Sequence, residues 1–200
     1  PEVAVHPSAV QTALGLLFRS RDNETRLQAV RLIVLALGDW HWTAPPVEVY
    51  TAYSVQPALE SYASLVDPIR KAVRPLIASN DPRLQEEAAR LLAILEDDDP
   101  ELLRRVASFW TVASHPTRDF HFLIVFSRLK GERDSALTEQ TARAVLGLDR
   151  KLEGQEMRSK QAWSDRLAEV TTRLLERDPT LADALLRAPN FATPGHVSIA

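Results

Sequence analysis

Two histidines and an aspartate near residue 118 are the side chains of this chain best suited to do chemistry. His115, Asp119 and His121 lie within seven residues of one another, and imidazole and carboxylate groups bind several divalent metal ions. The spacing argues against a shared ion, because His115 precedes the expected helix and residues 119 and 121 face different sides of it. In the alternative interpretation, Asp119 caps a helix that runs through Leu129. We therefore expect no metal ligand, no cofactor-binding residue and no catalytic residue here.

A second candidate site is the aromatic, proline-containing stretch at residues 39–56. It holds two of the four tryptophans and two of the three tyrosines: Trp40, Trp42, Tyr50 and Tyr53. Tryptophan and tyrosine dominate binding hot spots, so these four are the candidate partner-binding residues of a protruding loop. Alternatively, the loop folds back and its aromatic side chains cover one end of a helical stack, since large aromatics are mostly buried.

The elements that position these residues are expected to be helices, and the clearest pair occupies residues 67–95. An Asp-Pro pair at 67–68 is expected to begin the first helix, and Pro75 is expected to kink or divide it near Arg74. The Asn-Asp-Pro sequence at 80–82 is expected to end that helix and cap the next. Further helix caps are expected at Asn23 and Ser164.

The sequence between residues 75 and 92 resembles a HEAT repeat, whose pattern is LLPLL…L.D.d..VR..AA..L. The matching positions are Pro75-Leu76-Ile77, Asp81, Leu84, Ala88-Ala89 and Leu92. Gln85 stands where the family has arginine. A second copy lies 59 residues earlier, with Asp22 and Arg26 in the places of Asp81 and Gln85. Because a HEAT unit has about 40–47 residues, the resemblance implies an insertion after the first repeat, at 39–56.

Composition excludes several other classes. A net charge of −3 gives no electrostatic case for a nucleic-acid partner. The absence of cysteine excludes disulfides, cysteine-ligated zinc and covalent haem attachment within these residues. Apolar runs such as 32–37 and 122–126 are far shorter than the ~20 residues that cross a bilayer, so no membrane span is expected.

We therefore predict an all-α fold of antiparallel helical hairpins, stacked as a short HEAT-like α-solenoid. Residues 1–114 are expected to form HEAT-like helical repeats with the aromatic insertion at 39–56. Residues 115–200 are expected to continue the helical array or to form a more compact helical cap with an irregular tail. The resemblance implies a non-enzymatic scaffold or protein-interaction domain of a larger protein. Its partner would be another protein or a flanking domain of the same chain.

An alternative function comes from a second resemblance. The patterns F-x-x-P-x-H at 191–196 and D-x-H-x-L-I-V at 119–125 resemble segments of large planctomycete-type secreted proteins. In those proteins, HEAT-like segments accompany a haem-binding cytochrome c module and a propeller-type dehydrogenase. This resemblance implies a helical accessory domain of a redox protein whose catalytic and haem parts lie outside these residues. The location would then be extracytoplasmic, and otherwise cytoplasmic.

Overall fold

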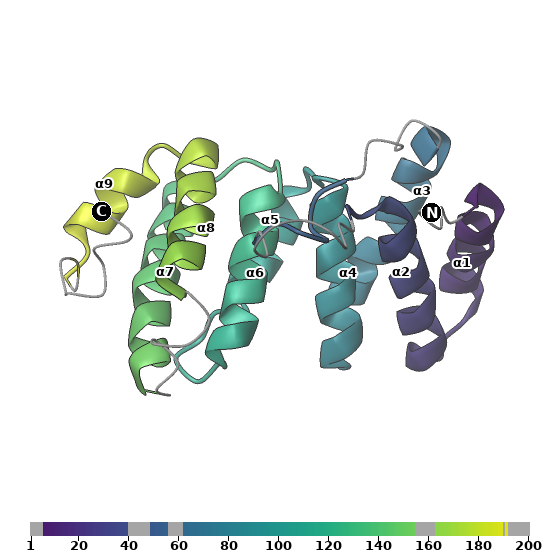
Figure 1. Cartoon of the computed structure of the whole chain (residues 1–200), viewed down its shortest axis with the longest axis horizontal. Coiled ribbons are helices and arrows are strands. Elements are labelled where there is room, and N and C mark those ends of the chain that lie inside the picture. The colour runs from purple at the N-terminus through teal and green to yellow at the C-terminus, as the bar shows by residue number, and fades with distance from the viewer. Residues whose placement is uncertain (1–5, 40–48, 56–61, 155–162, 190, 192–200) are drawn as a thin grey trace. The chain divides into compact units, whose positions relative to one another are not determined.

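The computed structural model describes residues 6–39, 49–55, 62–154, 163–189 and 191 (Figure 1). Within them the protein is all-helical, as predicted, with nine α-helices, one 3-10 helix and no strand. The chain divides into two compact units, residues 1–97 and 98–200. The change of organisation expected at residues 114–115 stays a prediction. No described helix combines the length and the apolar character needed to cross a membrane.

Among its described residues, the first unit contains four α-helices and the 3-10 helix η2. Their bounds are α1 Pro7–Arg19, α2 Asn23–Leu37, α3 Ala63–Val73, η2 Arg74–Ala78 and α4 Pro82–Ile94. Helix α1 packs against α2 and α3, and α2 packs against α4, which also contacts η2. The first helices of the two hairpins are therefore neighbours, and so are the second helices (Figure 1).

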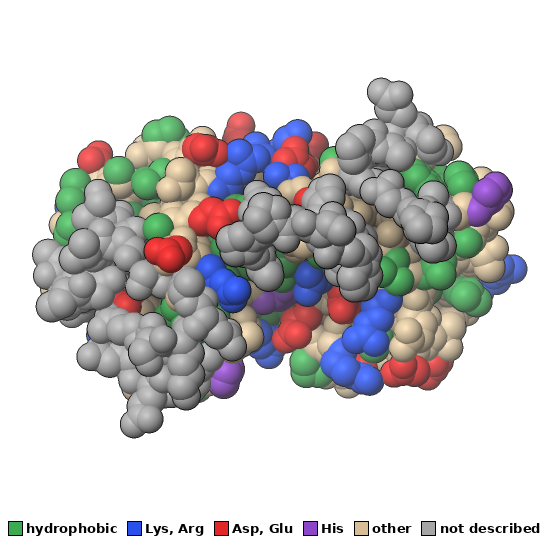
Figure 2. Space-filling model, viewed as in Figure 1, with side chains coloured by type: hydrophobic (Ala, Val, Ile, Leu, Met, Phe, Trp, Pro, Cys, Tyr) green, Lys and Arg blue, Asp and Glu red, His purple; other side chains and the backbone are tan. Residues whose placement is uncertain are grey.

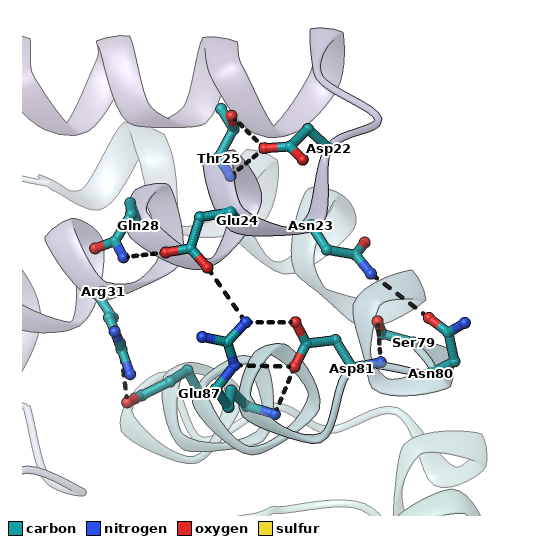
Figure 3. Close-up of polar contacts among 11 residues, drawn as sticks. Asp22, Asn23, Glu24, Thr25, Gln28, Arg31, Ser79, Asn80, Asp81 and Glu87 are labelled. Atoms are coloured by element: carbon teal, nitrogen blue, oxygen red, sulfur yellow. Dashed lines mark hydrogen bonds and ion pairs between the residues drawn. The ribbon is translucent and has the colours of Figure 1, made fainter.

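The turns of the two hairpins have the same construction. The hydroxyl of Ser20 accepts a hydrogen bond from the backbone N–H of Asp22 at 3.1 Å, and Ser79 accepts from Asp81 at 3.1 Å. Asp22 then caps α2 by accepting from the N–H of Thr25 at 2.7 Å, and Asp81 caps α4 by accepting from that of Arg83 at 3.0 Å. The polar contacts around both turns are drawn in Figure 3.

The position that is arginine in the HEAT pattern is Arg26 in the first hairpin and Gln85 in the second. The two side chains have the same role. Arg26 donates to the carbonyl of Ser20 at 2.7 Å. Gln85, which is 7% exposed, donates to the carbonyls of Ile77 at 2.8 Å and Ser79 at 3.4 Å. Either side chain thus satisfies the carbonyl six residues earlier, which belongs to the turn.

Ion pairs join α2 to α4 beside these turns (Figure 3). Arg83 contacts Glu24 of α2 at 3.2 Å and its own cap Asp81 at 3.1 Å. Further along the two helices, Arg31 lies 3.5 Å from Glu87. Solvent-exposed ion pairs add little to stability because water screens them, so we assign these pairs to the register of the two helices more than to stability.

A buried carboxylate closes the end of the first unit. Asp97 is fully buried and accepts two hydrogen bonds at 3.0 Å from the guanidinium fork of Arg74. Arg70 lies 3.7 Å from the same carboxylate and donates to the carbonyl of Leu95 at 2.6 Å. The end of α4 is thereby tied to α3 and η2.

Two expectations about the first unit are wrong. Helix α3 begins at Ala63, so Pro68 lies inside the helix and not at its start. Tyr62, which directly precedes this start, is buried, and the missing N–H of Pro68 removes only the hydrogen bond to exposed Ser64. The cap of α2 is Asp22 and not Asn23. The division of the helix near Arg74, by contrast, is confirmed.

The second unit is built around its second helix. Its helices are α5 Pro100–Ala107, α6 Pro116–Arg128, α7 Ser135–Gly154, α8 Trp163–Arg177 and α9 Leu181–Arg187. Helix α6 contacts α5, α7 and α8, and α7 contacts α5 and α9. Phe122 and Phe126 of α6 are buried, and they pack against Phe109 and Trp110 with ring centroids 4.6 and 5.1 Å apart.

Two expectations about helix starts in this unit are also wrong. Helix α6 begins at Pro116, and its cap is His115, whose Nδ1 accepts from the N–H of Thr117 at 3.3 Å. Asp119 lies inside the first turn, where its buried carboxylate pairs with a lysine of α7. Helix α8 begins at Trp163, a buried residue, so Ser164 lies within the helix.

Candidate binding cavity

The aromatic stretch is described only in its second half. Trp40 and Trp42 lie outside the described residues. Tyr50 is half-buried, and Tyr53 is 8% exposed. The carboxylate of Asp39 accepts from the backbone N–H groups of Ala52 at 2.9 Å and Ser54 at 3.3 Å, which holds the turn at 49–54 against the end of α2.

Tyr53 attaches this turn to α4. The guanidinium carbon of Arg90 lies 4.3 Å from the centroid of the Tyr53 ring, a cation–π contact. Burial raises the pKa of the Tyr53 hydroxyl to about 12, despite the opposing charge of Arg90. In this structure Tyr53 packs inside the first unit, and Tyr50 is the more exposed of the two tyrosines in this stretch.

The histidines and aspartate near residue 118 do not meet at one point. His115 is an exposed helix cap, and the ring of His121 packs edge-on against Phe122 at 4.8 Å. Within the part of the chain that the structure describes, no group of three His, Asp or Glu side chains is placed to hold a metal ion. Asp119 instead belongs to a cavity in the second unit.

This cavity has a volume of about 650 Å³, within the range of roughly 300–1,000 Å³ that is typical of ligand sites. The loop between α5 and α6 contributes three of its residues, α6 contributes Asp119, and the chain after α9 contributes two more. The largest share comes from one face of α7. The lining residues are Trp110, Thr111, Val112, Asp119, Gln140, Arg143, Ala144, Leu146, Gly147, Arg150, Lys151, Ala188 and Pro189.

Lys151 holds one side of the cavity together. Its ammonium group pairs with the Oδ2 atom of Asp119 and donates to the carbonyl of Thr111 at 2.5 Å and the hydroxyl of Ser114 at 2.9 Å. An ammonium group has three hydrogen-bond donors, so these acceptors use all of them. Lys151 therefore joins α7 to α6 and to the α5–α6 loop, and its charge is balanced by Asp119.

Two arginines give the cavity lining its excess of positive charge, and we call Arg143 and Arg150 the cationic pair. Both are exposed on α7 and lie two helical turns apart. Arg143 has one weak, exposed contact with Glu139 at 3.7 Å. Arg150 forms no ion pair with any described residue. Three cationic side chains and one anionic side chain line the cavity, which gives it a net charge of +2.

The remainder of the lining is largely apolar, and we call it the apolar wall: Trp110, Val112, Ala144, Leu146, Ala188 and Pro189. Val112 is 99% exposed, which is unusual for a side chain that gains free energy on leaving water. Gly147 lies between the two arginines, and a Cβ atom added there would meet no other atom within 4 Å. This helix face is thus open above Gly147.

Two polar atoms of the lining residues have no hydrogen-bond partner among the described residues. They are the indole Nε1 of Trp110 and the Oδ1 of Asp119, and both are buried. A buried polar group without a partner costs about 1–3 kcal/mol. The cavity therefore combines an excess of positive charge, apolar surface, one unused donor and one unused acceptor.

The charge of the cavity contrasts with the surface drawn in Figure 2. Acidic and basic side chains there lie next to one another on the face in view, without a large region of one sign. Such mixing is ordinary for a surface that keeps a protein in solution.

Sequence reasoning identified Asp119 but missed the cavity around it. The signal that was available is on α7, where Gln140, Arg143, Ala144, Gly147 and Arg150 follow helical spacing. Small residues between exposed arginines on one face leave room beside a helix.

No protein-family model matches the chain, and neither a curated protein nor a solved structure matches it.

Proposed function

We propose that this protein is a non-enzymatic helical-repeat domain of HEAT-like build that acts as a scaffold and binds another protein or a neighbouring domain. The observation that supports the proposal most is the repeated turn. In the first hairpin the hydroxyl of Ser20 accepts from the N–H of Asp22, and Arg26 donates to the carbonyl of Ser20. In the second, Ser79 accepts from the N–H of Asp81 in the same way, and Gln85 donates to the carbonyl of Ser79.

The packing of the helices adds support. In the first unit α1 lies beside α3 and α2 beside α4, and in the second unit α5 lies beside α7 and α6 beside α8. A stacked array keeps equivalent helices in rows, and proteins built in this way use the resulting long surfaces to bind partners. The second unit adds a ligand-sized cavity to such a surface.

The test is the capture and reconstitution of a partner. The protein, immobilised at one end, is exposed to an extract of its source cells, and each captured protein is then produced separately and mixed with it in purified form. We expect at least one captured protein to form a complex of fixed stoichiometry, measured by isothermal titration calorimetry. If no captured protein binds in purified form, the proposal is contradicted.

A further inference from the structure

We propose that the cavity of the second unit binds an acidic peptide segment of a partner protein. An apolar side chain of the segment lies on the apolar wall, and a carboxylate of the segment contacts the cationic pair. This inference rests on the proposed function, because it assigns a place and a chemistry to protein binding.

The charge of the cavity selects an anion. Lys151 and Asp119 neutralise each other, so the field of the cavity comes from Arg143 and Arg150. Guanidinium groups bind carboxylates through paired hydrogen bonds. A basic segment would be repelled by the same two side chains.

The apolar wall selects an amphipathic anion over a purely polar one. Val112 is almost fully exposed at the cavity, beside the indole of Trp110. A leucine-sized side chain in contact with this wall would remove apolar surface from water on both partners. A phosphate or a sugar would leave that surface uncovered.

The two unpartnered polar atoms favour a peptide over a simple fatty acid. A peptide backbone supplies both a carbonyl acceptor and an N–H donor, which match the indole N–H of Trp110 and the Oδ1 atom of Asp119. Both atoms are covered in the free protein, so pairing requires small rotations of these two side chains. The indole resonance of Trp110 is therefore a direct reporter of peptide binding.

The experiment titrates the ¹⁵N-labelled 200-residue protein with acetyl-Asp-Leu-Glu-Leu-Asp-amide and follows the Trp110 Nε1–H signal by NMR. That signal is assigned by its absence from the spectrum of Trp110→Phe. The matched probes are the neutral acetyl-Asn-Leu-Gln-Leu-Asn-amide, the basic acetyl-Lys-Leu-Lys-Leu-Lys-amide, and hexanoate, which carries an apolar chain and a carboxylate without a backbone.

Two glycines of α7 provide matched variants. Gly147→Leu fills the cavity, and Gly154→Leu places the same side chain on the same helix away from it, since an added Cβ has open space at both positions. We expect the acidic peptide to bind wild type and Gly154→Leu alike and to lose binding to Gly147→Leu. Arg143→Gln and Arg150→Gln should each weaken binding by about tenfold, as expected for loss of a charge-assisted hydrogen bond.

Four outcomes overturn the inference, and three of them concern the acidic peptide, its neutral counterpart and the cavity-filling variant. They are no change at Trp110 at millimolar acidic peptide, equal binding of the neutral peptide, and binding that survives in Gly147→Leu. Hexanoate binding as tightly as the peptide also overturns it and identifies a site for small amphipathic carboxylates. None of these results bears on whether a reconstituted partner binds elsewhere on the protein, so failure here is distinguishable from failure of the proposed function.

Discussion

At the scale of single residues, Tyr53 gives the clearest pH-dependent prediction. Its hydroxyl has a pKa near 10 in an unfolded chain, and burial raises that pKa to about 12 in the folded protein. The folded state therefore holds this proton more tightly than the unfolded state. The stability contributed by Tyr53 is fully present below pH 10 and is lost as the pH rises toward 12. At 1.36 kcal/mol for each pKa unit, the loss is roughly 2–3 kcal/mol.

Ultraviolet absorbance of tyrosinate, recorded for wild type and for Tyr53→Phe, isolates this titration. We expect the difference curve to have its midpoint near pH 12, with helical circular dichroism recorded in parallel to show that the protein is still folded. A midpoint near pH 10 in folded protein would show that Tyr53 is accessible to solvent. Tyr53 would then be open to a partner, as the prediction for the 39–56 stretch requires.

At the scale of elements, the end of α4 carries a strained residue. Glu96 has a φ of 48°, in the left-handed region. Its N–H donates to the carbonyl of Ala93 at 3.0 Å, and the N–H of Asp97 donates to that of Leu92 at 3.1 Å. These two bonds form a Schellman motif, in which the left-handed position is usually glycine.

Glu96→Gly should therefore stabilise the protein by about 0.5–1 kcal/mol, because glycine adopts this conformation without the cost that a Cβ imposes. The free energy of unfolding in urea measures the effect. Glu96→Ala is the control: it removes the same side chain but keeps the Cβ, so it should give no comparable gain. A Glu96→Gly variant no more stable than Glu96→Ala would mean that the backbone at residue 96 is not left-handed.

The sequence was informative about where helices begin, end or break wherever neighbouring residues in the chain determine that position. The turn at residues 80–82 and the break at Pro75 both depend on neighbours in the chain. The start of α3 at Ala63 could not be predicted in this way, because no side-chain cap marks it and the residue before it, Tyr62, is buried in tertiary structure. The cavity was equally out of reach, since Lys151 and Asp119 are 32 residues apart and meet only once α7 packs on α6.

At the scale of the whole molecule, helices two apart in the chain pack against each other within each unit, and the two hairpin turns of the first unit share one hydrogen bond from an aspartate N–H to a serine hydroxyl. The repeat explains how the sequence departs from the HEAT pattern without a visible change in structure. Gln85 replaces an arginine, yet it donates to the same turn carbonyl as Arg26 does. The claim that the two hairpins are copies of one unit can therefore be tested by asking whether these two side chains have the same role in their turns.

The measurement that tests this claim most directly is the free energy of unfolding of Arg26→Gln compared with that of Arg26→Ala. If the hairpins are equivalent, glutamine satisfies the carbonyl of Ser20 as Gln85 satisfies that of Ser79. Arg26→Gln should then stay within about 1 kcal/mol of wild type, while Arg26→Ala loses about 1–3 kcal/mol because that carbonyl is left without its partner. Gln85→Ala should lose a similar amount. Equal losses for Arg26→Gln and Arg26→Ala would contradict the equivalence of the two hairpins, and with it the repeat on which the proposed function depends.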